Sequence, residues 1–160
     1  MTVGFAIAVS GGALAAGLAA AGSSIGVGLA GEMAGGVLSE DPDKFGPMLI
    51  LQALPATQSI YGLIVAILVM VKLQILGGTN PLFDLGLGKG IAVFGACIPA
   101  MFGELISAIW QGRSAVASMG LVAKKPDAFG KAVILPAMVE TFGLFALIAT
   151  ILILMVGIQF

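Results

Sequence analysis

One carboxylate in the middle of an apolar segment is the residue of this chain best suited to chemistry. Glu140 lies about three helical turns beyond Phe129, inside a long apolar stretch. A carboxylate at that depth in a membrane costs about 2.5–3.5 kcal/mol or more, and it usually marks an ion or substrate path. The alternative is a protonated glutamic acid that only joins two helices by a hydrogen bond.

Two other polar residues fall at the same depth as Glu140. Thr57 follows Phe45, and Gln111 precedes Ala123, in each case by about three helical turns. At a rise of 1.5 Å per residue, each site is about 17 Å from the corresponding helix end. We therefore expect Thr57, Gln111 and Glu140 to lie at one level of the molecule.

The segment that contains Thr57 also presents a polar stripe. Leu54, Thr57, Gln58 and Tyr61 follow the i, i+3, i+4, i+7 spacing of one helix face. Pro55 interrupts the backbone hydrogen bonds of this helix and frees carbonyl oxygens. A hydroxyl, two amide oxygens, a carbonyl and one carboxylate then form an oxygen site with a single negative charge.

Such a site suits a hard monovalent cation. Ca²⁺ and Mg²⁺ usually attract more carboxylates and waters, whereas a proton needs only the carboxyl group and one hydrogen-bond partner. The extra oxygens favour Na⁺ (or Li⁺), and H⁺ is the alternative that stays open.

The elements that position these residues are four long apolar segments. Apolar residues make up 59% of the 160 residues and charged residues only 9%, with a net charge of −1. The segments run over about residues 4–38, 45–76, 87–123 and 129–160. Each exceeds the roughly 20 residues that span a bilayer core, so we predict an all-α membrane protein with four transmembrane helices.

Several function classes are excluded by what the sequence lacks. The chain has no His and one Cys, so His-dependent triads and disulfide frameworks are absent. No P-loop occurs, so we expect no nucleotide-binding site, no catalytic residues and no active site in this chain. The balanced charge also argues against nucleic-acid binding.

The chain contains an internal repeat. When the sequence is aligned with itself so that Pro42-Asp43 falls on Pro126-Asp127, Phe45-Gly46 falls on Phe129-Gly130. The same alignment places Glu140 on Ala56, so only one hairpin carries the carboxylate. We predict two tandem hairpins in parallel orientation, residues 1–80 and residues 81–160, with the ion-binding Glu140 in the second. This parallel repeat argues against inverted-repeat transporters, because their halves have opposite topology.

Basic residues predict the orientation of the hairpins. Most of the seven cluster around residues 39–44 and 124–127: Lys44, Arg113, Lys124, Lys125 and Lys131. The positive-inside rule therefore puts these two loops in the cytoplasm and both termini outside, in a multi-pass protein of the plasma membrane.

Small residues predict the assembly. The first segment contains Gly22-x-x-x-Gly26 and Gly31-x-x-x-Gly35, a spacing that lets helix backbones approach closely. A closed ring of subunits explains small residues along the whole segment, and a monomeric four-helix bundle with one close crossing is the alternative.

Specific motifs resemble a known family. LPATQSIYG (54–62), WQG (110–112), AKKPD (123–127) and PAMVET (136–141) are similar to the c-type proteolipid of V-type and A-type rotary ATPases. Within that family, the four-helix K subunits of Na⁺-translocating bacterial and archaeal enzymes are the most similar form.

This resemblance implies a membrane rotor ring whose Gly-rich helices line the inner wall. It assigns the Na⁺ ligands to the Leu54 carbonyl, Thr57, Gln58, Gln111 and Glu140. Tyr61 matches the tyrosine that hydrogen-bonds the carboxylate. The implied partners are further copies of the chain, a stator membrane subunit that bears an arginine, a central-stalk subunit on the cytoplasmic loops, and the lipid bilayer.

Three other functions remain as alternatives. The first is a rotor subunit of the same kind that carries H⁺ instead of Na⁺. A small four-helix cation antiporter would need aromatic walls and a cavity for a large cation, and a structural pore-forming proteolipid gives Glu140 no task. Glu104 departs from the family pattern. It lies two turns before Gln111, too far to be a direct ion ligand, and is expected to be protonated or hydrogen-bonded in a structural role. The alternative is that it lines the route of the ion or contacts a neighbouring copy.

Overall fold

The structure, a computed structural model, describes residues 1–159 and contains four long helical spans. α1 (Val3–Glu40) and α4 (Leu87–Lys124) have 38 residues each, which corresponds to about 57 Å of helix. The second span is divided into α2 (Phe45–Ala53), a 3₁₀ turn (Leu54–Ala56) and α3 (Thr57–Lys72). α5 (Phe129–Leu152) is followed by a π-helical turn at Ile153–Gly157. All four spans are long and apolar enough to cross a membrane.

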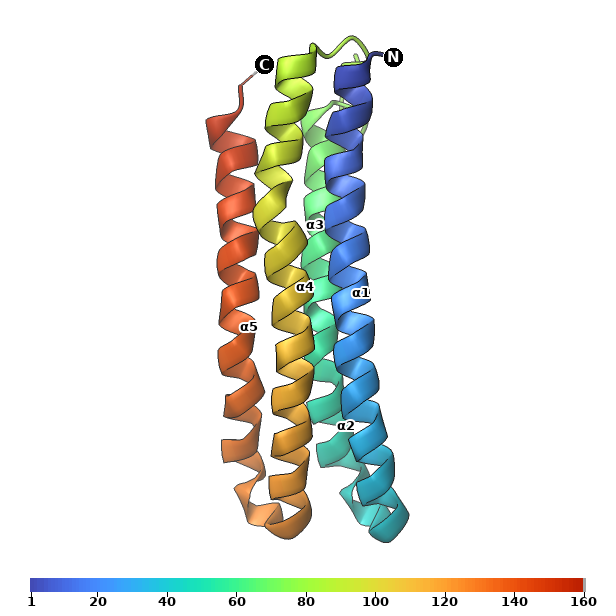
Figure 1. The fold of residues 1–160 in the computed structure, drawn as a ribbon, viewed down its shortest axis with the longest axis vertical. Coiled ribbons are helices and arrows are strands. Elements are labelled where there is room, and N and C mark those ends of the chain that lie inside the picture. Colours follow the sequence, from blue (N-terminus) through green and yellow to red (C-terminus); the bar gives the residue numbers. More distant parts are fainter. Residues whose placement is uncertain (160) are drawn as a thin grey trace.

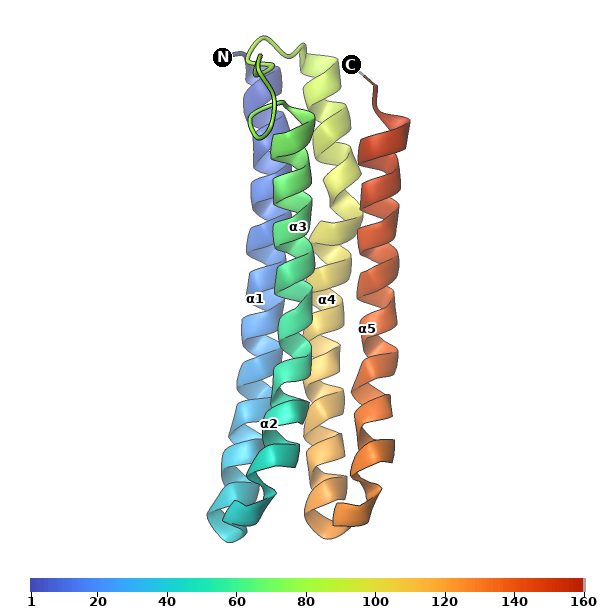
Figure 2. The same ribbon diagram turned by 180° about the vertical axis from the view of Figure 1, so that it is seen from behind.

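The spans run side by side along one axis as two hairpins (Figure 1 and Figure 2). 3₁₀ turns at Pro42–Lys44 and Pro126–Ala128 close the hairpins at one end. The two described ends of the chain and the linker between the hairpins lie at the other end (Figure 1). This arrangement confirms the predicted all-α fold with four membrane-spanning helices.

α1 and α4 form the central helix pair of the molecule. α3 packs against α1 and α5 against α4, while smaller contacts join α3 to α4 and α5. Gly22 and Gly26 allow the central contact: a Cβ at Gly22 would lie 2.6 Å from the Leu105 carbonyl oxygen, and one at Gly26 would collide with the Ala108 carbonyl. The Gly22-x-x-x-Gly26 pair therefore brings two backbones together within a single chain.

The second span ends earlier than residue 76, the end predicted from apolarity alone. Gln74 adopts a left-handed φ of 58°, and the Gln74 and Ile75 N–H groups donate to the Val71 and Met70 carbonyls, both at 2.9 Å. This is the Schellman arrangement that terminates helices. Leu73 is buried in the core at this end and Ile75 packs against it, whereas Leu76 is exposed.

The linker of residues 73–86 is attached to the start of the chain. The Thr2 hydroxyl donates to the Leu85 carbonyl at 2.6 Å, and the Thr2 N–H donates to the Phe83 carbonyl at 2.9 Å. The Phe5 and Phe83 rings meet edge to face with centroids 5.3 Å apart. These contacts fix the two hairpins relative to each other at this end.

Candidate functional site

The predicted polar residues meet where α3, α4 and α5 come together. α3 supplies Thr57, Gln58 and Tyr61, α4 supplies Gln111, and α5 supplies Glu140. Gln58 and Gln111 are completely buried, whereas Glu140 is half-buried.

Both oxygens of the Glu140 carboxylate accept hydrogen bonds. The Tyr61 hydroxyl donates to Glu140 Oε1 at 2.7 Å. Gln111 Nε2 donates to Glu140 Oε2 at 3.3 Å. The three side chains come from three different helices, so the carboxylate holds α3, α4 and α5 in one network.

The network continues from Gln111 to Gln58. Gln58 Nε2 donates to Gln111 Oε1 at 2.6 Å. Gln58 Oε1 lies 3.3 Å from Thr57 Oγ1, on the opposite side of the amide. Gln111 Oε1 is therefore turned toward Gln58, and Gln58 Oε1 is the amide oxygen on the side of the site where Thr57 lies.

The 3₁₀ turn before α3 shapes the remaining part of the site. Pro55 lies in this turn, and the Leu54 carbonyl accepts the Thr57 backbone N–H. The same carbonyl also accepts the Thr57 hydroxyl at 3.0 Å. The expected interruption of the helix at Pro55 is thus present, and it turns the Leu54 oxygen toward the Thr57 side chain.

One residue of the network was missed by the sequence interpretation. Ser107 Oγ accepts from Gln58 Nε2 at 3.1 Å and donates to the Val139 carbonyl at 3.1 Å. Its position one turn before Gln111 on a largely apolar helix was a usable signal, because residues one turn apart share a helix face.

Glu104 is close to this network but outside it. Its side chain is completely buried, and neither carboxylate oxygen has a hydrogen-bond partner within residues 1–159. A Cβ on Gly143 would lie 2.7 Å from Glu104 Oε2 and 3.3 Å from Ser107 Oγ. The Glu104 carboxyl group therefore packs against the backbone of α5. It forms no hydrogen bond with the described residues, so the expectation of a hydrogen-bonded Glu104 is not met there. A charged carboxylate so placed is costly, so the protonated form remains our prediction.

The chemistry of the site depends on a single acid. In the part of the chain that the structure describes, no cluster of three or more His, Cys, Asp or Glu residues occurs. Neutral hydroxyl, amide and carbonyl groups around one carboxylate can balance one positive charge, whereas divalent cations usually need more carboxylates.

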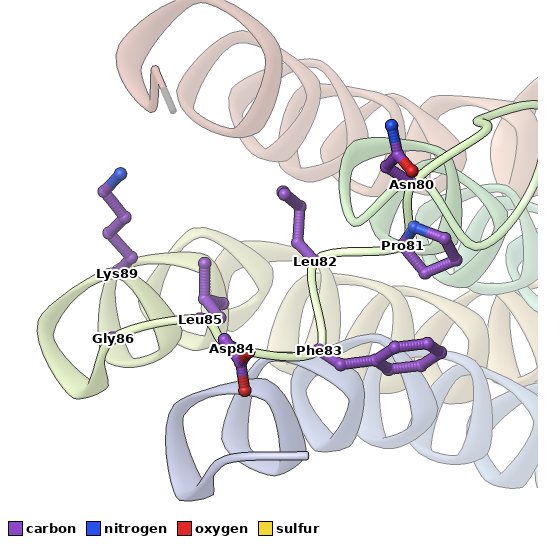
Figure 3. Close-up of a pocket in the computed structure, with 8 residues that line it drawn as sticks. All are labelled: Asn80, Pro81, Leu82, Phe83, Asp84, Leu85, Gly86 and Lys89. Atoms are coloured by element: carbon purple, nitrogen blue, oxygen red, sulfur yellow. The ribbon is translucent and has the colours of Figure 1, made fainter.

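A cavity of about 380 Å³ lies far from this network, at the linker end of the bundle (Figure 3). It is formed by residues 80–86 of the linker and by Lys89 at the start of α4. The Asp84 and Lys89 side chains point in different directions in Figure 3. These two charged side chains therefore do not converge on one point as the groups around Glu140 do.

Comparisons with known proteins show the family to which the chain is similar. The family of the ATP synthase C subunits matches residues 10–69 and again residues 94–153. The chain belongs to this family. Residues 10 and 94, where the two matches begin, correspond to each other under the alignment that places Pro42 on Pro126, so the family match follows the internal repeat.

Two relatives of this family member are named as K subunits, one of a V-type sodium ATPase and one of an A-type ATP synthase. The V-type sodium ATPase subunit K of Enterococcus hirae is 37% identical over 134 residues, which cover 84% of this chain and 81% of the relative. The A-type ATP synthase subunit K of Methanocaldococcus jannaschii is 39% identical over 148 residues, 92% of this chain and 61% of the relative. The chain thus spans less than two thirds of the archaeal relative's length.

Proposed function

We propose that this family member is a rotor subunit of a V- or A-type ATPase or ATP synthase and carries Na⁺ across the membrane. The observation that carries the proposal is the arrangement around Glu140. One half-buried carboxylate is hydrogen-bonded by Tyr61 and Gln111, and the buried Gln58 amide lies next to Gln111. The sodium enzyme named for the E. hirae relative supports the choice of ion.

In this proposal, the Glu140 carboxylate balances the charge of Na⁺, and oxygens of neighbouring residues complete the coordination of the ion. The ligands are the Leu54 carbonyl, Thr57 Oγ1, and the side-chain oxygens of Gln58, Gln111 and Glu140. Tyr61 holds Oε1 of Glu140 and Gln111 holds Oε2, and each carboxylate oxygen keeps a further lone pair for the ion. The site then alternates between a Na⁺-bound carboxylate and a form from which an arginine of a stator subunit has released the ion.

We further propose that copies of the chain form a closed ring. Gly17, Gly28 and Gly35 of α1 have open space where a side chain would begin. On the other side of the molecule, an apolar groove between α4 and α5 is lined by Gly103, Ile106 and their neighbours. α1 and α4 are corresponding helices of the two repeats. The contact between α1 of one copy and α4 of the next can therefore resemble the contact between α1 and α4 within one chain.

The remaining topology follows the basic residues. The loops at 39–44 and 124–127 face the cytoplasm and contact the central stalk, and both termini face outward, in the cell membrane. Residues 1–80 form the hairpin without an ion carboxylate, and residues 81–160 form the hairpin with Glu140.

A carbodiimide that reacts only with protonated carboxyl groups tests the identity of the ion. Bound Na⁺ keeps Glu140 ionised, so Na⁺ should slow its labelling in the detergent-extracted oligomer, and K⁺ should be far less effective. Lower pH should weaken the protection, because protons and Na⁺ compete for one carboxylate. Thr57→Val and Gln111→Leu each remove a ligand oxygen and should raise the Na⁺ concentration that protects. Labelling that ignores Na⁺ at neutral and alkaline pH would instead identify a proton carrier.

A further inference from the structure

The buried amide of Gln58 can face the ion in two ways, and the difference matters for Na⁺. With its oxygen toward the ion the amide is a ligand, and with its NH₂ group there it repels the ion. The side chain is completely buried, so water is not available to compensate for a wrong orientation. The orientation must therefore be set by hydrogen bonds to neighbouring residues.

Ser107 is the neighbour that decides this orientation on one side. The Val139 carbonyl can only accept a hydrogen bond, so the Ser107 hydroxyl donates its one hydrogen to this carbonyl, at 3.1 Å. The Ser107 oxygen is then an acceptor, and Gln58 meets it with Nε2 at 3.1 Å. A flipped Gln58 amide would bring its oxygen against an oxygen that has no hydrogen to give.

The second hydrogen of Gln58 Nε2 is fixed from the other side. The Glu140 carboxylate accepts from Gln111 Nε2 at 3.3 Å, which turns Gln111 Oε1 toward Gln58. Gln58 Nε2 donates to that oxygen at 2.6 Å. Both amide hydrogens are thus used, and Gln58 Oε1 is left on the side of Thr57.

We propose that Ser107 is a positioning residue for the ion site: it holds the Gln58 amide with its oxygen toward the cation and thereby raises the affinity for Na⁺ without touching the ion. This inference rests on the proposed function. Ser107 acts through Gln58, so its loss should weaken Na⁺ binding while Glu140 keeps its contacts with Tyr61 and Gln111.

The chain offers a matched control in the same helix. Ser118 of α4 is also buried and donates to a carbonyl of α5, that of Ala132 at 2.8 Å. It lies about three turns farther along α4 than Ser107, and this hydrogen bond reaches no residue of the proposed site. Ser118→Ala therefore removes the same type of helix–helix hydrogen bond without affecting Gln58.

The experiment is protection of Glu140 from carbodiimide by Na⁺ in the intact detergent-extracted oligomer. Ser107→Ala should raise the Na⁺ concentration for half-protection by about fivefold to tenfold, the effect of one lost buried hydrogen bond. Ser118→Ala should change it by less than about threefold. The labelling rate without Na⁺ should be equal in both variants and in the wild type, because Glu140 itself is unaltered.

Two further variants distinguish positioning from packing. Ser107→Thr keeps the hydroxyl, and its methyl group can enter the apolar groove that Ser107 borders, so it should restore the wild-type Na⁺ requirement. In a Gln58→Leu background, Ser107→Ala should cause no additional loss, because there is no amide left to orient.

The outcomes separate the inference from the proposed function. If Na⁺ protects the wild type but Ser107→Ala behaves like Ser118→Ala, Ser107 is only a packing residue and the inference is wrong. An additional loss in the Gln58→Leu background has the same consequence. If Na⁺ does not protect even the wild type, the proposed Na⁺ function fails before the variants are compared.

Discussion

At the scale of residues, the two intramembrane acids of the second hairpin, the half-buried Glu140 and the buried Glu104, have opposite surroundings. Glu140 accepts hydrogen bonds from Tyr61 and Gln111, groups that stabilise a charged carboxylate. Glu104 has no hydrogen-bond partner within the described residues and is completely sealed inside one chain. A neighbouring copy cannot reach it, so a proton is the simplest way to remove its charge.

Removing the charge of Glu140 should abolish ion binding without affecting assembly. Glu140→Gln keeps nearly the same shape but cannot balance a cation, so Na⁺ binding and ion-coupled ATP turnover should be lost while the oligomer remains intact. Equilibrium binding of radioactive Na⁺ to the purified oligomer measures this. Glu32→Gln is the control, since Glu32 is exposed near the hairpin end of α1. Undiminished coupled transport by Glu140→Gln would refute the assignment.

Removing the charge of Glu104 should have little effect on the ion. A protonated carboxyl group and an amide are both neutral, so Glu104→Gln should leave the Na⁺ affinity within about tenfold, or roughly 1.4 kcal/mol. The same binding measurement tests this. A larger loss would mean that Glu104 is charged or acts directly on the ion.

At the scale of elements, interruptions and ends of helices do most to shape the site. The 3₁₀ turn at Leu54–Ala56 directs a backbone oxygen toward Thr57, and the hairpin turns set the depth of every span. At the first hairpin turn, Lys44 pairs with Asp41 at 3.0 Å and donates to the Ala123 carbonyl at 2.8 Å. This lysine therefore connects the turn of the first hairpin to the end of α4.

Straightening the second span should weaken the ion site. Pro55→Ala restores an N–H group and allows a regular α-helix, in which the Leu54 carbonyl would bond along the helix axis. The Na⁺ concentration for half-protection of Glu140 should rise by about threefold to tenfold, with helical content by circular dichroism unchanged or higher. An unchanged Na⁺ requirement would show that the Leu54 oxygen is not a ligand.

The Asp41–Lys44 pair should make the hairpin turn sensitive to pH. The hydrogen bond from Lys44, aided by its charge, lowers the pKa of Asp41 below the usual value of about 3.9. A lowered pKa stabilises the fold above the unfolded-state pKa, and this contribution disappears as the pH falls through the folded-state value. The midpoint temperature of thermal unfolding should therefore be higher for the wild type than for Asp41→Asn at neutral pH, and the two should be equal near pH 2. Added salt should reduce the difference at neutral pH. A gap that persists in acid would contradict this mechanism.

At the scale of the whole molecule, the glycines of α1 divide into two groups. Gly22 and Gly26 are used within the chain, because a Cβ there would meet α4. Gly17, Gly28 and Gly35 have no atoms within 4 Å of an added Cβ. The first group is needed for the fold of one chain, and the second is available for contact with another copy.

Leucine substitutions at Gly26 and Gly28 should separate folding from assembly. Gly26→Leu collides with Ala108 and should destabilise the single chain, with reduced yield and lower thermal stability. Gly28→Leu points into open space and should leave the single chain folded but prevent the close packing of copies. Native mass spectrometry in detergent measures the oligomer size. A ring of normal size in Gly28→Leu would mean that this face of α1 is not the contact between copies.

The sequence alone was enough to predict the four spans, the internal repeat and the common depth of Thr57, Gln111 and Glu140. These depend on local composition and on a constant rise per residue, which need no knowledge of neighbours. The tertiary structure was needed for the features that depend on how helices face each other. It decided that Ser107 bonds Gln58, that Glu104 packs on Gly143, and that Gln74 ends the second span. Depth along a membrane follows from counting residues, whereas the rotation of one helix against another depends on side-chain packing across the interface.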